Sequence, residues 1–188
     1  RVVDPHFDPP RPVPSAMVTL TDVGTDRTDT RGNASVTAPV NNETTLRVTR
    51  DGYRTVERDL TVGEEATNLS VDISRTPSLT LEAANERIVA GERVIVGATD
   101  AYGDPATVAE VYLDGERVGT TDGEGEARVR IDDPGDHTLY VIRNGVRSNE
   151  VSVEAISADG GDAGTADATP TASPTSEPTA TPTATTTT

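Results

Sequence analysis

The chain has 188 residues and a formal net charge of −16, because it holds 32 Asp and Glu residues and only 16 basic residues, all of them Arg. It contains no Cys and no Trp, and aromatic residues make up 3% of it, which excludes a disulfide framework, thiolate metal sites and a large aromatic enzyme core. An acidic, Arg-only composition is typical of proteins adapted to concentrated salt, where a screening length of about 3 Å removes most charge repulsion.

The N-terminal part of the chain predicts short β-strands. It begins with Val2-Val3-Asp4 and a Pro-rich loop over residues 6–14, and apolar and polar residues then alternate strictly over residues 17–21. Such alternation is typical of a strand with one buried face. Asp51-Gly52 lies between two further alternating runs and predicts a two-residue hairpin turn.

The pattern continues after a connector, Arg75-Thr76-Pro77. The Pro favours an extended conformation before it, and we expect this short connector to hold the flanking parts in a semi-rigid arrangement. Further strands and two-residue hairpin turns are predicted at residues 78–84, 93–100 and 110–114 and at Asp114-Gly115 and Asn144-Gly145.

The two parts are related by an internal repeat with an offset of 93 residues. Thr28-Asp29-x-x-Gly32 aligns with Thr121-Asp122-x-x-Gly125, and the same register aligns residues 16–20 with residues 109–113. A register kept over several strands predicts two related modules in tandem. Because the Thr-Asp-x-x-Gly motif occurs twice at the same offset, we interpret it as a structural turn and not as a catalytic pair.

The first module has no counterpart of residues 78–97. It therefore either lacks its opening strands or pairs residues 67–73 in their place. Since an unpaired edge strand favours association with other chains, we expect the natural protein to continue upstream of Arg1.

From residue 157 onward the composition is dominated by Asp, Gly, Ala, Thr, Ser and Pro, with Pro at every fourth position from Pro170 to Pro182. Such a segment buries too little apolar surface to offset the entropy of ordering, which predicts a disordered tail. Its Thr/Pro-rich composition is typical of O-glycosylated stalks, and an unmodified linker is the alternative.

Both modules resemble known families. The first, with residues 16–20, Thr28-Asp29-x-x-Gly32 and Arg50-Asp51-Gly52-Tyr53, resembles the carboxypeptidase regulatory-like domain, a transthyretin-like sandwich, over about residues 13–73. The second, with Asp100-Ala101-Tyr102-Gly103-Asp104-Pro105 and Thr121-Asp122-x-x-Gly125, is similar to the bacterial-type immunoglobulin-like domains of invasin and intimin. The tail is similar to the Thr/Pro-rich stalks that precede membrane anchors in surface proteins of halophilic archaea.

The predicted fold class is therefore all-β, with two tandem immunoglobulin-like or transthyretin-like β-sandwiches and a disordered C-terminal tail. The predicted domains are residues 1–75, a sandwich truncated at its N-terminus, residues 76–156, a second sandwich, and residues 157–188, a stalk.

The sequence assigns no catalytic, cofactor-binding or metal-ligating residue. His6 and His137 are the only His residues, and neither has a second His or an activated nucleophile near it in the sequence. Acidic groups around Asp100, Asp122 and Asp132 suit Ca²⁺ by charge, but none matches a calcium-loop pattern, and Asp in turns commonly bonds its own backbone. We therefore expect no enzyme activity and no cofactor.

Three Asn residues lie in N-x-[ST] sequons that N-glycosylation requires: Asn33, Asn42 and Asn68. Asn42, which we expect in a loop, is the best placed of the three. A Thr-rich chain also produces sequons by chance, so unused sequons are the alternative.

The sequence predicts a non-enzymatic, extracellular, cell-surface protein of a halophile, whose sandwiches act as spacer or adhesion modules on a glycosylated stalk. One alternative is a carbohydrate-binding module, in which Phe7 and Tyr102, from corresponding loops, would contact the sugar. The other is a set of accessory domains of a larger secreted peptidase or transporter. Expected partners are surface proteins or glycans, the negative charge argues against nucleic acid, and membrane attachment is expected only through an anchor outside this sequence.

Overall fold

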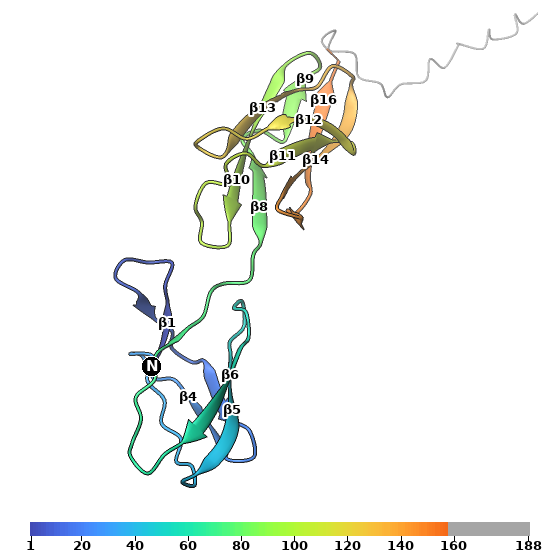
Figure 1. The fold of residues 1–188 in the computed structure, drawn as a ribbon. Coiled ribbons are helices and arrows are strands. Elements are labelled where there is room, and N and C mark those ends of the chain that lie inside the picture. The colour runs from blue at the N-terminus through green and yellow to red at the C-terminus, as the bar shows by residue number, and fades with distance from the viewer. Residues whose placement is uncertain (158–188) are drawn as a thin grey trace, which may run out of the picture. The chain divides into compact units, whose positions relative to one another are not determined.

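The computed structural model describes residues 1–157, which form sixteen β-strands and no helix (Figure 1). The all-β prediction is thus confirmed. None of the described residues belongs to a helix of the length and apolar character needed to cross a membrane. The predicted stalk, apart from Ser157, lies outside the described residues.

The first sandwich is built from seven strands in two sheets, with strand orders β2-β1-β7 and β4-β3-β5-β6. All pairs are antiparallel except β1 with β7, which run parallel. The strands are β1 (Val2–Asp4), β2 (Arg11–Pro12), β3 (Met17–Leu20), β4 (Gly24–Arg27), β5 (Asn42–Thr49), β6 (Val56–Val62) and β7 (Val71–Asp72).

The second sandwich has the sheet orders β13-β10-β8 and β12-β11-β14-β16-β9, with β15 paired to β14. Its last strand, β16, pairs in parallel with β9. A three-stranded sheet packed on a larger, otherwise antiparallel sheet is an immunoglobulin-like arrangement. The strands are β8 (Leu79–Ala83), β9 (Arg87–Val89), β10 (Arg93–Asp100), β11 (Glu110–Leu113), β12 (Glu116–Thr120), β13 (Glu126–Arg130), β14 (Gly135–Arg143), β15 (Val146–Arg147) and β16 (Val151–Ile156).

Each sandwich encloses its own hydrophobic core of Val, Leu, Ile and Ala side chains, which suits a chain this poor in aromatic residues. The two cores share no residue. The domain boundaries after residues 75 and 156 stay a prediction. The fully buried aliphatic side chains of the two cores include Val13, Val48, Ile73, Leu81, Val94, Val96, Val111, Ile131, Leu139, Val141 and Val153.

The repeat is visible in the strand register. Leu20 pairs with Leu46 between β3 and β5. The residues 93 positions later, Leu113 and Leu139, pair between β11 and β14. The predicted tandem relationship of the two modules therefore extends to individual residue pairs.

A buried Thr closes the same loop in both sandwiches. Thr121 is 3% exposed, and its hydroxyl accepts a hydrogen bond from the Ala109 N–H (2.8 Å) and donates one to the Ala106 carbonyl. Thr28 makes the same two bonds to the residues 93 positions before these partners. Both partners of the Thr hydroxyl are backbone groups. The hydroxyl therefore supplies hydrogen bonds that strand pairing does not supply to this N–H and this carbonyl.

The next residue of the motif shapes the turn. The Asp122 Oδ1 atom accepts hydrogen bonds from the N–H groups of Glu124 (3.0 Å) and Glu126 (2.9 Å), and Asp29 makes the equivalent pair of bonds at 2.8 Å each. This geometry confirms the prediction that these Asp residues form turns.

The Gly of the motif is required for two reasons. Gly32 and Gly125 have φ values of 75° and 76°, in the left-handed region that favours glycine. In addition, a Cβ on Gly125 would lie 2.6 Å from the Ala98 carbonyl oxygen, and one on Gly32 would clash with the Val2 carbonyl oxygen. The Thr-Asp-x-x-Gly motif is thus structural in both sandwiches.

The predicted hairpin turns have different outcomes. Asp114-Gly115 and Asn144-Gly145 have positive φ at both positions and join strands whose flanking residues pair, so these two predictions are confirmed. The prediction for Asp51-Gly52 is wrong. Between β5 and β6 the last register pair is Val48 with Val56, which leaves a seven-residue connection in which only Gly52 of the two has positive φ.

Strand β7 resolves the alternative posed by the missing opening strands. Val2 and Val3 pair with Val71 and Asp72, so the region 67–73 does supply the partner. On one edge of β1 the Val2 N–H donates to the Gly32 carbonyl. On the corresponding edge of β10 the Ala98 N–H donates to the Gly125 carbonyl. Strand β7 therefore occupies the opposite edge, where β8 pairs in the second sandwich.

Candidate functional site

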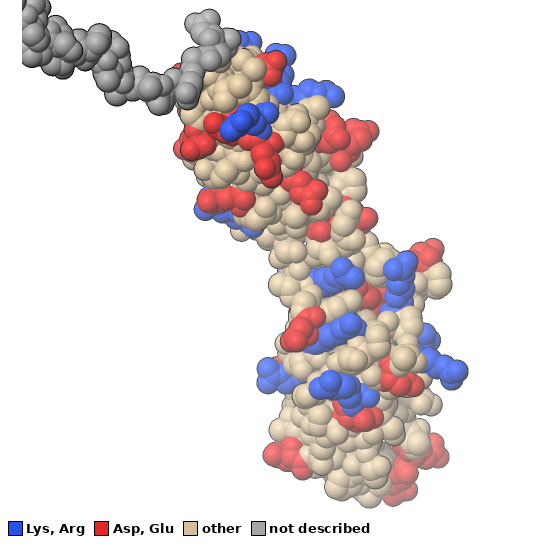
Figure 2. Space-filling model, turned by 180° about the vertical axis from the view of Figure 1, so that it is seen from behind, with Lys and Arg blue, Asp and Glu red and all other residues tan. Residues whose placement is uncertain are grey.

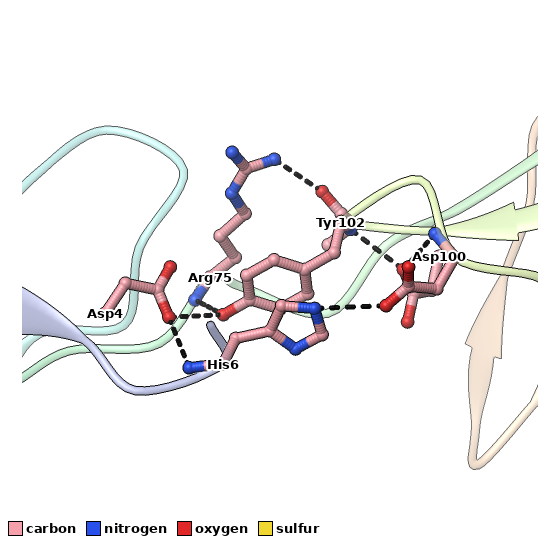
Figure 3. A network of polar contacts seen from close by, with 7 residues as sticks. Asp4, His6, Arg75, Asp100 and Tyr102 are labelled. Atoms are coloured by element: carbon pink, nitrogen blue, oxygen red, sulfur yellow. Dashed lines mark hydrogen bonds and ion pairs between the residues drawn. The ribbon is translucent and has the colours of Figure 1, made fainter. Parts of the chain in front are cut away.

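A network of polar and aromatic contacts joins the two sandwiches (Figure 3). Its residues come from the end of β1 and the loop after it, from the connector, and from the end of β10 and the loop after it. We call this network the junction. It consists of Asp4, His6, Phe7, Arg75, Asp100, Tyr102 and Asp104.

Asp4 is the buried acid of the junction, with 1% of its surface exposed. Its Oδ1 atom accepts hydrogen bonds from the His6 N–H (3.1 Å) and from the Tyr102 hydroxyl (3.2 Å). Its Oδ2 atom is buried and makes no hydrogen bond to the described residues. A buried carboxylate is costly unless donors surround it, so the Tyr102 hydroxyl contributes directly to its accommodation.

The Tyr102 hydroxyl links three segments of the chain. It accepts a hydrogen bond from the backbone N–H of Arg75 (2.9 Å) while it donates to Asp4. Burial raises the pKa of Tyr102, and the negative charge of Asp4 adds to the rise. The phenol consequently keeps its proton at neutral pH, as donation to a carboxylate requires.

Arg75 and the residue after it bond the connector to both sandwiches. Its Nη1 atom donates to the Ala101 carbonyl (2.8 Å), and its guanidinium carbon lies 5.1 Å from the centre of the Tyr102 ring. On the other side, Arg75 forms a β-bridge with Tyr53, and the next residue, Thr76, donates to the Gly52 carbonyl (2.8 Å). The Tyr53 side chain and then the Asp4 charge raise the pKa of Arg75, so it stays charged.

Aromatic packing covers the outer side of the junction. The His6 ring stacks on the Tyr102 ring with centroids 3.6 Å apart and an interplanar angle of 12°. The His6 Nε2 atom lies 3.0 Å from Asp104 Oδ2. Phe7 meets Tyr102 edge-on at 5.9 Å, and the Arg11 guanidinium lies 3.7 Å above the Phe7 ring. Loops from both sandwiches thus share one aromatic cluster.

The loop that carries Tyr102 is itself held by Asp100. The Asp100 Oδ1 atom accepts hydrogen bonds from the N–H groups of Tyr102 (2.8 Å) and Asp104 (3.1 Å). The Asp100 carboxylate therefore shapes a turn, as predicted for acids of this type, whereas the Asp104 carboxylate pairs with His6. Within residues 1–157, no group of three or more His, Asp or Glu side chains is placed to hold a metal ion.

Removing the Tyr102 hydroxyl tests the junction energetically. In Tyr102→Phe, the Asp4 carboxylate loses a donor and the Arg75 N–H loses its acceptor, so the free energy of unfolding is expected to fall by about 1–3 kcal/mol. Thermal or denaturant unfolding at fixed salt measures the loss. Tyr112→Phe is the matched control, because within residues 1–157 the Tyr112 hydroxyl forms a hydrogen bond only to Glu110 on the same strand, at 3.3 Å. Equal losses in the two variants would contradict an energetic role of the junction.

The structure brings together the two aromatic residues predicted for a ligand-binding loop. Phe7 and Tyr102 come from different sandwiches and contact each other. One face of the Tyr102 ring is covered by His6, and Arg11 lies over the Phe7 ring. The assignment of these rings to a ligand stays a prediction.

The sequons occupy different environments in the first sandwich. Asn33 and Asn68 are exposed. Asn42 is only partly exposed, because it is the first residue of β5 and pairs with Val62, so the expected loop position of Asn42 is wrong. Use of any of the three sequons stays a prediction.

His137 forms an ion pair away from the junction. Its Nδ1 atom lies 2.6 Å from Asp114 Oδ2, and its Nε2 atom lies 2.9 Å from the Asp133 carbonyl oxygen. With acceptors on both ring nitrogens, the protonated ring is favoured. The hydrogen bond to Asp114 raises the pKa of His137, while a backbone bond from Thr138 and the bond with His137 lower the pKa of Asp114.

This pair predicts a defined pH dependence. The contribution of His137 to stability is complete below its ordinary pKa and is lost as pH rises through the raised value. The contribution of Asp114 is present above its ordinary pKa and is lost as pH falls through the lowered value. In Asp114→Asn, which suits the same left-handed turn position, the pKa of His137 should fall toward its ordinary value in an NMR titration. An unchanged His137 pKa would contradict the pairing.

Most of the junction could not be identified in the sequence. Tyr102 and Phe7 were recognisable as aromatic residues in corresponding loops, and the connector was recognisable by its Pro. The sequence gives no local signal for Asp4, for Arg75 or for the pairing of His6 with Asp104. These contacts depend on segments far apart in the chain; the bond between Tyr102 and Asp4, for example, spans 98 positions.

No family model matches this chain, and no curated protein matches it. Several solved structures are similar to it in fold alone. The fibronectin(III)-like modules of CbhA from Clostridium thermocellum share 18% identity at a TM-score of 0.34, over 81% of this chain and 83% of that chain. The four N-terminal Ig domains of Dscam1 isoform 6.9 share 13% at a TM-score of 0.30, over 79% and 38%. Domains 4 and 5 of the S-layer protein SbsC share 14% at a TM-score of 0.27, over 74% and 99%.

The topology on its own defines the class of the molecule. Residues 1–157 form an all-β protein with two immunoglobulin-like sandwiches in tandem, which are joined by a connector that bonds to both.

Proposed function

We propose that this chain is a non-enzymatic part of an extracellular, cell-surface protein of a halophile, and that its sandwiches act as spacer or adhesion modules. The resemblances to the carboxypeptidase regulatory-like domain, to invasin-type immunoglobulin-like domains and to Thr/Pro-rich archaeal stalks belong to this proposal. So does the use of Asn33, Asn42, Asn68 or the Thr-rich tail for glycosylation.

The observation that carries the proposal is the junction. Domains in one chain usually move relative to each other unless their interface is large and hydrophobic, so resistance to motion here has to come from contacts at the short connector. Here the backbone N–H of Arg75 bonds to Tyr102, its guanidinium bonds to Ala101, and a buried Asp4 completes the network. A spacer needs a connector that resists bending, and these contacts supply a physical means of resisting it.

The charge of the chain supports the high-salt setting. The Arg-only basic residues and the net charge of −16 suit concentrated salt, where repulsion between acidic groups is screened. On the face drawn in Figure 2, Arg side chains gather over the first sandwich and its meeting with the second, with acidic side chains among them. Such mixed surfaces favour hydration and discourage aggregation.

Intact mass measurement and glycopeptide mapping of the protein isolated from its native cell envelope test the proposal. Sugars on a sequon or on the Thr-rich tail, in an envelope fraction, are the expected result. An unmodified protein recovered from the cytoplasm, or one joined to a catalytic domain that it serves, would contradict it.

A further inference from the structure

Beside the junction lies a recess with a volume of about 430 Å³ that both sandwiches line. Arg54 and Arg75 reach it from the first sandwich and the connector, and Arg143 and Asn144 reach it from the end of β14 and the following turn. Leu79 and Tyr102 add apolar surface. The volume falls within the range of about 300–1,000 Å³ that is typical of small-ligand sites.

The recess is basic in a chain that is strongly acidic. Three guanidinium groups line it together with one acid, Asp100, whose Oδ1 atom already accepts two backbone hydrogen bonds. The side chains of Arg54 and Arg143 form no ion pair or hydrogen bond with the described residues, although acidic residues outnumber basic ones by two to one over the whole sequence. Their donors are therefore available to a ligand.

The chemistry of the guanidinium group indicates what the ligand carries. Arg presents a planar fork of donors that matches the paired oxygens of a carboxylate or sulfate group. Arg75 uses one of its donors for the Ala101 carbonyl and retains others. The adjacent Asn144 side chain can bond further ligand oxygens or hydroxyl groups. Because directed hydrogen bonds depend less on long-range attraction, such a site also remains selective in concentrated salt.

We propose that this recess is a binding site for a small acid, whose carboxylate or sulfate group is held by Arg54, Arg75 and Arg143. The site is distinct from the spacer role, but it affects the junction. Its basic residues come from both sides of the connector, so a bound acid contacts both sandwiches at once only while they are docked. Binding therefore stabilises the docked arrangement, and the stabilisation grows with the logarithm of ligand concentration once that concentration exceeds the dissociation constant.

Titration of the full-length chain with sodium sulfate and with sodium glucuronate, each at constant ionic strength against sodium chloride, tests the site. Backbone amide NMR signals of Ala101, Tyr102 and Asn144 are expected to shift and saturate. The probe that saturates at lower concentration distinguishes a sulfated ligand from a carboxylated one. For the double variant Arg54→Gln/Arg143→Gln, affinity is expected to fall about tenfold or more, as for the loss of charge-assisted hydrogen bonds.

Two further variants make the result specific. Arg117→Gln is the matched control, because Arg117 pairs with Glu110 (3.1 Å) and lies outside the recess, so its affinity should equal that of the wild type. Arg143→Lys keeps the charge but removes the planar fork, and it should weaken binding. Shifts that stay linear in both probes, or that persist unchanged in the double variant while its amide spectrum remains folded, would overturn the proposal.

Discussion

Replacing Gly125 with Ala is expected to lower the free energy of unfolding by about 3 kcal/mol or more. The left-handed backbone conformation, with φ of 76°, costs a residue with a Cβ about 1–2 kcal/mol. The new Cβ would also lie 2.6 Å from the Ala98 carbonyl oxygen and 3.0 Å from the Ala106 nitrogen. Both neighbours are backbone atoms, so relief requires the loop to move away from β10, at an additional cost of about 1–3 kcal/mol.

Gly145→Ala is the matched control for this prediction. Gly145 has a nearly identical φ of 77°, but no atom outside its own neighbours lies within 4 Å of the added Cβ. The control therefore reports the backbone cost alone, and the difference between the two variants reports the close approach of the loop to β10. Denaturant unfolding at fixed salt measures both. If the two variants lose the same stability, the proposed close packing at Gly125 is contradicted.

The second large effect is expected for Thr121→Val, which keeps the shape of the side chain but removes its hydroxyl. The Ala109 N–H then loses its acceptor and the Ala106 carbonyl loses a donor, both in a buried loop. Each group left without its partner costs about 1–3 kcal/mol, so a total loss of about 3 kcal/mol is expected.

The repeat offers an internal replicate of this experiment. Thr28→Val should produce a loss of similar size in the first sandwich, because Thr28 makes the same two bonds. Thr121→Ser retains the hydroxyl and should lose distinctly less stability than Thr121→Val. A Ser variant as unstable as the Val variant would show that the methyl packing, and not the hydrogen bonds, determines stability here.

The sequence could predict what depends on local pattern. Alternating residues around Val18 and Val111, the Thr-Asp-x-x-Gly turn and the turn at Asn144-Gly145 all follow from short-range chemistry, and the structure confirms them. The offset of 93 residues went further, since it predicted two related modules, and the structure has equivalent hydrogen bonds from Thr28 and Thr121 in the two sandwiches.

The sequence could not predict what depends on distant contacts. Asp51-Gly52 has the composition of a tight hairpin, yet the chain around it is drawn into contact with the connector, where Gly52 accepts a hydrogen bond from Thr76. The parallel pairing of β1 with β7 and the junction around Asp4 likewise join segments about 70 to 100 positions apart. Composition and periodicity do not indicate such pairings.

The measurement that most directly tests the central claim, a connector fixed to both sandwiches, is a set of amide residual dipolar couplings from the full-length chain in high salt. Couplings from residues 2–73 and from residues 79–155 are expected to fit one alignment tensor. Tyr102→Phe should separate the two fits if the hydroxyl holds the junction. Two tensors of different magnitude in the wild-type protein would show independent motion of the sandwiches and would contradict the claim.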